Sequence, residues 1–457
     1  MVTIPSDTER SVDENMRSRL TEKSTSATLL LFVLLVAGMS STVKAQLYHP
    51  TTIYDSSADP TMPLPVIGYA PAIVPVSGVI RVLVIAAAYA DVNYTLSITQ
   101  LRKAWFGAVA TYYHEVSYGK LTIQGDIYGW YKLPYPKSHY GRNCISINDA
   151  DCSGQDQSYQ IANDVTVLVQ KEVNFYNYDY YVFIHSGPGQ ETSGDKDDVW
   201  SVTYMSGVWV RTNSKTLTKF NIVPEIEARG VVPNGVWCLE FGHNLGLPDL
   251  YNTSNHTTVL GPWELMDKGS FNGNPTGSSP AHMIAWDKIQ LGFISGSMLA
   301  TAYPGVPSTF AVDPTEVAST KVHAVKMQLT NSADPNPSQY YLVEVRTQSG
   351  FDSALPAAGV LITYVDETLT IGPVRVMNGH PNVSNLTDAV WNVGQTFTDS
   401  EHNLVVKVIG KIGNSYQITV GSIGHRPSPS VQNQTHIHLA VTSKAQKPLR
   451  EVLQQTD

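Results

Sequence analysis

The repeat pattern of the sequence changes once, near residue 300, and this change limits the chain to folds with two differently built parts. Before it, apolar runs typical of buried strands alternate with stretches of helical periodicity. The strands are predicted at about 80–88, 121–127 and 179–185. The helices are predicted at about 97–119 and 159–173, from near Asn234 through the motif at 239–249, and at 278–291. After it come strand-like runs at 322–329, 340–346, 359–366, 404–410 and 416–420, separated by turn-rich linkers. This order predicts an α/β or α+β domain with a mixed sheet at 78–297, followed by an all-β, sandwich-like domain at 298–423.

The two ends of the chain have a different composition. Residues 27–39 (ATLLLFVLLVAGM) are apolar without a break but fall short of the ~20 residues that a membrane-spanning helix needs. Small residues follow, so we expect a signal peptide at 1–45, cleaved before Gln46. The alternative is an uncleaved anchor. Residues 46–77 form a Pro-rich lead or short pro-segment, and the polar tail at 424–457 is expected to be disordered.

Glycosylation sequons and cysteines agree with export. The chain has an Asn-x-Ser/Thr pattern at Asn93, Asn252, Asn255, Asn382, Asn385 and Asn433. Cys144 and Cys152 flank a polar loop and are candidates for a disulfide, whereas Cys238 is left over. These features predict a secreted, extracellular glycoprotein.

Composition and charge exclude some partners. The formal net charge is -9, and no run of Lys and Arg could neutralise a phosphate backbone, so nucleic acid is not an expected partner. With 42% hydrophobic residues, the chain can bury an ordinary core. No stable membrane span is expected, and the oligomeric state is not specified by the sequence.

The segment 239–249 (LEFGHNLGLPD) nearly matches the pattern H-E-x-x-H-x-x-G-x-x followed by a third metal ligand. In that pattern two ligands at i and i+4 lie one turn apart on one face of a helix and bind zinc together. The Glu between them acts as general base on the water bound to the metal. The Gly allows a sharp turn that returns the third ligand to the metal.

In this chain the general base is Glu240, the ligands are His243 and Asp249, and the turning glycine is Gly246. The first ligand should stand at position 239, where the sequence has Leu239. An isobutyl side chain has no lone pair to donate to a metal. The motif therefore offers two protein ligands where three are needed, and weak or absent zinc binding is expected.

One cysteine and three histidines outside the pattern are alternative candidates for the missing ligand. Cys238 is adjacent, but one step along a helix turns a side chain by ~100°. His185, His256 and His282 lie in other segments that are candidates to approach the cleft, but no pattern in the sequence directs them to the metal. We interpret these histidines as structural or surface residues.

Several blocks of the sequence, in order from about 80 to 420, are similar to the immune inhibitor A family of secreted zinc metallopeptidases, which are related to the metzincins. The most characteristic block is FGHNLGLPDLY at 241–251. The others are 82–91 (VLVIAAAYAD), 110–120 (ATYYHEVSYGK), Trp130-Tyr131, Tyr178-Asp179, 185–189 (HSGPG), Trp200-Ser201, 261–269 (GPWELMDKG), 285–288 (AWDK), Leu291-Gly292 and 340–366. The resemblance implies a metzincin-like catalytic domain with a β-rich domain behind it. It further implies zinc as cofactor, a protein or peptide substrate, and Met266 as the methionine of the Met-turn beneath the metal.

Because Leu239 departs from the family pattern, three hypotheses stay open. One is a secreted metallo-endopeptidase with residual or rescued activity. Another is a non-catalytic pseudopeptidase that binds proteins, peptides or glycans. The third is a structural surface glycoprotein held by the apolar segment at 27–39.

Overall fold

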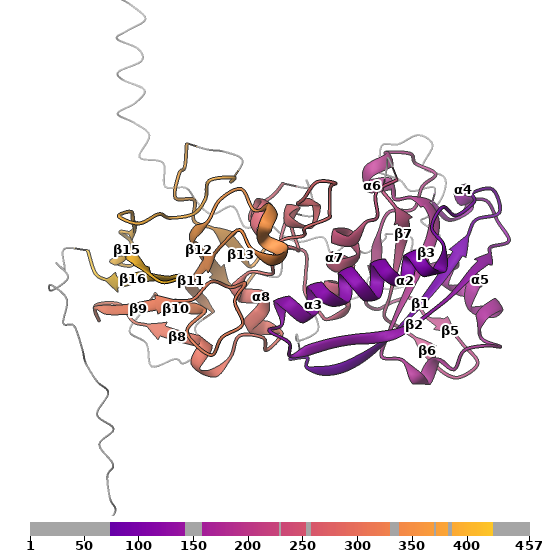
Figure 1. The fold of residues 1–457 in the computed structure, drawn as a ribbon, viewed down its shortest axis with the longest axis horizontal. Coiled ribbons are helices and arrows are strands. Elements are labelled where there is room, and N and C mark those ends of the chain that lie inside the picture. Colours follow the sequence, from indigo (N-terminus) through magenta and orange to yellow (C-terminus); the bar gives the residue numbers. More distant parts are fainter. Residues whose placement is uncertain are drawn as a thin grey trace, which may run out of the picture. The chain divides into compact units, whose positions relative to one another are not determined.

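The computed structural model describes residues 74–141, 158–227, 230–252, 257–329, 338–369, 372–382 and 386–423. Over these residues the protein is a mixed α/β structure with several sheets and few helices (Figure 1). Some predictions fall on residues outside these ranges. They concern the signal peptide at 1–45, most of the lead at 46–77, the pair Cys144 and Cys152, the residues Asn255, His256, Asn385 and Asn433, and the tail at 424–457.

A five-stranded sheet in the order β2-β1-β3-β7-β4 organises the N-terminal part. Strands β1, β2, β3 and β7 run parallel, and β4 pairs antiparallel with β7 at the edge. Residues 82–88 of β1 are buried on both sides, which explains why this strand reads as a continuous apolar run. The bounds are β1 Gly78–Ala88, β2 Leu121–Lys132, β3 Tyr180–Pro188, β4 Val202–Tyr204 and β7 Phe220–Ile226.

Helices cover the two faces of this sheet. One face packs against a long helix that comprises α2 (Ile98–Lys103), the π-helical turn η1 (Ala104–Val109) and α3 (Ala110–Val116), seen crossing the sheet in Figure 1. The helix α7 (Asn234–Asn244) packs on the same core. The opposite face packs against α5 (Tyr159–Val169). Ser97 caps the long helix with a capping box to Gln100, which explains its start.

Shorter elements connect these parts. They are α4 (Lys137–Gly141), η2 (Phe175–Asn177), α6 (Gln190–Ser193), β5 (Val210–Arg211), β6 (Thr216–Leu217), η4 (Gly261–Trp263), η5 (Lys268–Phe271), α8 (Ala285–Gln290), η6 (Gly296–Met298) and η7 (Gly350–Ala354). None of the helices among the described residues is both long enough and apolar enough to cross a membrane.

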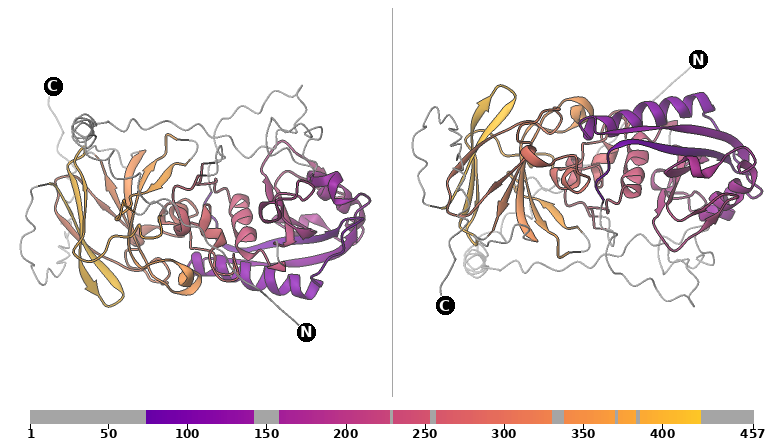
Figure 2. Two further views of the ribbon diagram at one scale, coloured as in Figure 1. Left: turned by 90° about the horizontal axis from the view of Figure 1, so that it is seen from above. Right: turned by 90° about the horizontal axis from the view of Figure 1, so that it is seen from below.

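The C-terminal part contains two sheets. One has the order β13-β12-β11-β10-β8, and the other the order β14-β15-β16-β9. Both contribute side chains to one hydrophobic cluster, and Figure 2 shows the yellow strands β15 and β16 beside the orange strands in both views. The bounds are β8 Leu299–Ala302, β9 Ser308–Val312, β10 Ala324–Gln328, β11 Gln339–Arg346, β12 Gly359–Asp366, β13 Val374–Val376, β14 Thr396–Asp399, β15 Leu404–Ile412 and β16 Ser415–Gly421.

A shared core joins the C-terminal sheet to the segment that follows α7. Leu342 and Leu361 belong to the same buried cluster as Trp263 and Trp286. Arg346 of β11 is fully buried there; its Nη1 donates to Trp263 O at 2.6 Å and its Nη2 to His282 O at 3.2 Å. Its charge is balanced by Asp352, whose Oδ2 lies 2.7 Å from Nη2.

The predicted strands and helices are found in the expected order, with one correction. The helix predicted at 278–291 is wrong in its first half, because only Ala285–Gln290 is helical. The extended backbone before it is held by distant carboxylates. His282 N donates to Asp352 Oδ1 at 2.8 Å, and Ile284 N donates to Glu264 Oε2 at 2.5 Å.

Candidate active site at helix α7

Helix α7 carries the motif and is anchored on all sides by buried contacts. The Trp237 indole N–H donates to Pro224 O of β7 at 2.9 Å, and the Tyr113 hydroxyl donates to Cys238 O at 2.6 Å. Gly242 lies against Met266, where a Cβ atom would come within 2.8 Å of the sulfur. The motif therefore sits on a rigid helix wedged between the sheet and the segment around Met266.

The chain turns sharply after α7 and brings Asp249 back to His243. Gly246 has φ +105°, a conformation that favours glycine, and it follows directly after the end of the helix. His243 Nδ1 contacts Leu247 O at 2.8 Å, and Leu250 N donates to Met266 O at 2.9 Å, which fix the returning segment. As a result, His243 Nε2 lies 3.2 Å from Asp249 Oδ1. The structure thus brings together the two ligand residues that the motif predicted.

The electrostatics of this pair are set by its burial. Burial by itself would lower the pKa of His243, but the Asp249 carboxylate, together with Glu240 and the Leu247 carbonyl, raises it to about 9. Because this raised pKa favours a protonated imidazole at neutral pH, His243 and Asp249 form an ion pair. Asp249 Oδ1 makes no well-aligned hydrogen bond within the described part of the chain.

Glu240 is held in a polar network on the neighbouring side of α7. Its Oε2 lies 2.5 Å from Thr203 Oγ1 of the edge strand β4, and its carbonyl oxygen accepts from Asn221 Nδ2 at 2.8 Å. Burial raises the pKa of Glu240 to about 7, against the lowering effects of His243 and Thr203. A second amide, Asn244 Nδ2, donates to Asn221 Oδ1. Sequence reasoning missed Thr203, Asn221 and Asn244, since no local pattern connects them to Glu240.

Leu239 stands at the position that the motif predicts for the first ligand. It is partly buried and packs against the hydrophobic core one helical turn before His243. The separation of 3.2 Å between the His243 and Asp249 donor atoms would suit two ligands of one tetrahedral zinc, which are expected ~3.3 Å apart for bonds of ~2.0–2.1 Å. The number of donors does not suit zinc, because a catalytic site needs three protein ligands. Among the described residues, no group of three or more His, Cys, Asp or Glu side chains is placed to hold a metal ion. The donor set therefore does not fit a catalytic zinc.

The other candidate ligands lie in the core or contact residues outside the motif. The Cys238 thiol is buried in the core, and burial raises its pKa. His185 is buried beside Tyr89 with Nδ1 3.1 Å from Ser186 O, and burial lowers its pKa to about 4. His282 Nε2 contacts Glu115 Oε1 at 2.8 Å, and its Nδ1 contacts Lys288 Nζ at 3.1 Å. None of these described side chains replaces Leu239.

The remaining predicted residues are placed as follows. Met266, the predicted Met-turn residue, is fully buried and packs against Gly242 of α7. Of the glycosylation candidates within the described ranges, Asn93 and Asn382 are exposed, whereas Asn252 is buried and pairs with Thr257.

Comparison with known proteins supports the resemblance. Residues 87–197 and 176–296 match the sequence model of the immune inhibitor A peptidase M6 catalytic domain. A pre-pro-metalloprotease, PrtV, of Vibrio cholerae serotype O1 is 26% identical over 218 residues, which cover 40% of this chain and 23% of that protein. Immune inhibitor A of Bacillus thuringiensis subsp. alesti is 27% identical over 207 residues, which cover 37% of this chain and 29% of that protein. The chain thus matches less than a third of the length of either relative.

Proposed function

We infer that the chain belongs to the immune inhibitor A peptidase family, M6, because residues 87–296 match its catalytic domain. From this premise we propose that it is a secreted family member that binds protein or peptide. We further propose that its ability to hydrolyse peptide bonds is impaired or lost. The observation that carries the proposal is Leu239 at the first ligand position of an otherwise complete motif. The family implies a zinc cofactor. We propose that this chain binds that metal weakly or not at all.

The cost of the missing ligand is large. Structural zinc sites with four ligands bind with ~10–16 kcal/mol, so one ligand contributes on the order of 3 kcal/mol. This amounts to about two decades of affinity. A zinc held by His243 and Asp249 alone would also leave two open positions, so its bound water would be poorly oriented toward Glu240. Both effects argue against efficient hydrolysis.

The retained groups favour a cleft that still receives a polypeptide. Glu240, the expected general base, keeps its position next to the edge strand β4 through Thr203. Strand β4 lies against the motif helix at Glu240, and we propose that the ligand binds beside these two elements. We therefore propose a protein or peptide ligand, bound without efficient cleavage.

The finer assignments of fold and location are part of the same proposal. We propose a metzincin-like domain at 78–297 with Met266 in the Met-turn, and a sandwich-like domain at 298–423. The signal peptide at 1–45, the Cys144–Cys152 disulfide and glycosylation at the exposed Asn93 and Asn382 are proposed for the secreted form. The pre-pro name of the Vibrio relative supports export.

Metal analysis and a peptidase assay on the purified secreted chain test this function. We expect less than stoichiometric zinc after dialysis against micromolar zinc, and casein or peptide cleavage that neither chelator nor the Glu240→Gln substitution changes. Glu240→Gln serves as the matched control because it removes the general base without changing side-chain size. Stoichiometric zinc together with cleavage that both chelator and Glu240→Gln abolish would overturn the proposal in favour of an active peptidase.

A further inference from the structure

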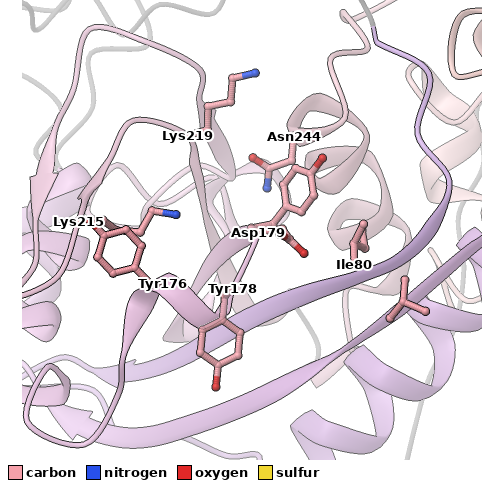
Figure 3. Close-up of a pocket in the computed structure, with 9 residues that line it drawn as sticks. Ile80, Tyr176, Tyr178, Asp179, Lys215, Lys219 and Asn244 are labelled. Atoms are coloured by element: carbon pink, nitrogen blue, oxygen red, sulfur yellow. The ribbon is translucent and has the colours of Figure 1, made fainter.

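A cavity of about 590 Å³ opens at the starts of strands β1 and β3, beside the last residue of α7. Figure 3 shows its walls. The residues that line it are Val79, Ile80, Tyr176, Tyr178, Asp179, Tyr180, Lys215, Lys219 and Asn244. We call it the Asn244 cavity. None of Leu239, Glu240, His243 and Asp249 lines it, so its role does not depend on the proposed function.

Asn244 supplies a buried acceptor without a partner. Its side chain is 3% exposed, and its Oδ1 makes no hydrogen bond within the described ranges. The orientation of this amide is fixed by its neighbour. Asn221 Nδ2 donates to Glu240 O, so the Asn221 Oδ1 atom faces Asn244. Asn244 therefore donates to this oxygen through its Nδ2. The Asn244 Oδ1 atom is therefore a buried acceptor without a partner on a residue that lines the cavity.

Two ammonium groups give the cavity a positive side. Lys215 Nζ lies over two aromatic rings, 5.0 Å from the ring centre of Tyr181 and 5.9 Å from that of Tyr176. Lys219 is exposed, and within the described ranges neither lysine forms an ion pair. Figure 3 shows Lys215 and Asn244 facing the same space, with Lys219 at its rim. An anionic group placed there would meet unpaired cations.

Aromatic rings and a carboxylate complete the walls. The Tyr176 ring is 67% exposed, which is unusual for an aromatic side chain that lines a cavity. Asp179 is exposed and lines the cavity, and its Oδ2 accepts from Arg81 N at 2.8 Å, which fixes the carboxylate as a second acceptor. The cavity thus combines ring faces, two acceptors and two cations.

We propose that the Asn244 cavity binds an acidic sugar residue of a glycan, such as a uronate or a sulfated hexose. A pyranose presents hydroxyl donors around an apolar C–H face, which matches the Asn244 and Asp179 acceptors beside the exposed ring of Tyr176. Its carboxylate or sulfate matches Lys215 and Lys219. An acidic peptide would satisfy the lysines but carries few side-chain donors for the two acceptors, so the sugar is the better fit.

Binding of defined oligosaccharides to the full-length secreted chain tests the proposal. The probes are a hyaluronan octasaccharide, which carries carboxylates, a heparin octasaccharide, which also carries sulfates, and neutral maltooctaose. We expect one or both acidic probes to bind and maltooctaose not to bind. Which acidic probe binds more tightly identifies carboxylate or sulfate as the preferred anion.

Substitutions locate the binding in the cavity. We expect Lys215→Met and Lys219→Met to weaken binding about tenfold each, and Tyr176→Ala about fivefold. The matched control is the double variant Lys103→Met/Lys407→Met, which removes two exposed charges elsewhere and should keep the affinity within about twofold. Thermal unfolding of each variant confirms that it is folded.

Three results would overturn the proposal. One is equal binding of maltooctaose and the acidic probes. Another is unchanged binding of the acidic probes in the folded lysine variants. The third is binding of an octaglutamate peptide in place of either acidic saccharide, which would assign the cavity to an acidic peptide.

Discussion

Restoring the missing ligand by Leu239→His should create a zinc site in this chain. Position 239 lies one turn before His243 on α7, and His243 already faces Asp249 at 3.2 Å, so the new imidazole would bring the donors to three. One added ligand contributes on the order of 3 kcal/mol, so zinc should bind about 100-fold more tightly than in the wild-type chain. Competition with a chromophoric chelator measures this change directly. Because His243 must lose its proton to bind zinc, the affinity should rise between pH 7 and pH 9.

Two variants make the result interpretable. Leu239→Met has a similar volume and no strong zinc donor, so its affinity should equal that of the wild type. His243→Leu, added to Leu239→His, should remove the gain. If Leu239→His changes the zinc affinity by less than about threefold while remaining folded, the assignment of position 239 as the empty ligand position is refuted. Peptide cleavage by the zinc-loaded Leu239→His variant is a further, independent readout.

Two stability predictions follow from buried charges. Burial and the charge of Glu191 raise the pKa of Glu227 from 4.5 to about 8. The folded state is therefore destabilised progressively as the pH rises from about 4.5 to 8. Glu227→Gln should remove this loss and increase the free energy of unfolding by about 2–4 kcal/mol over wild type at pH 8, with no increase at pH 4.5. Urea unfolding at both pH values measures this, and an equal gain at both would contradict it. Asp352→Asn should cost about 3–5 kcal/mol in the free energy of unfolding, because Asp352 lies 2.7 Å from the fully buried Arg346. The control is the exposed Lys321, whose Nζ lies 3.7 Å from Asp313, and Lys321→Met should cost less than about 1 kcal/mol. Similar costs for both variants would refute the reasoning.

The sequence predicted those parts of the fold that local patterns encode. The apolar run 82–88 predicts a central strand, the apolar spacing after Ser97 predicts a helix, and the spacing from Glu240 to Asp249 places the motif on a helix followed by a turn. Periodicity failed where distant carboxylates hold the backbone. The segment before Ala285 looks helical in sequence, but Glu264 and Asp352 bind its N–H groups and keep it extended.

The candidate site was predictable to a similar extent. The residues within the motif could be found because their chemistry depends on their spacing. Thr203 and Asn221 could not, because they come from strands β4 and β7 and meet Glu240 only in the folded chain. Short edge strands such as β4 also carry too few residues to show a period.

The buried Arg346 has a consequence for how such a chain can change over evolutionary time. The family match ends at residue 296, yet Arg346 from β11 holds the carbonyls of Trp263 and His282, inside the matched region. A genetic exchange that replaced only the matched segment would keep the ion pairs of Arg346 with Glu344 and Asp352 but would remove the two carbonyls that accept its other N–H groups in the interior, unless the new segment returned them to the same places. We therefore expect the two regions to be inherited together. A change such as Leu239 would then arise by point substitution within the chain, and not by exchange of one of the two regions.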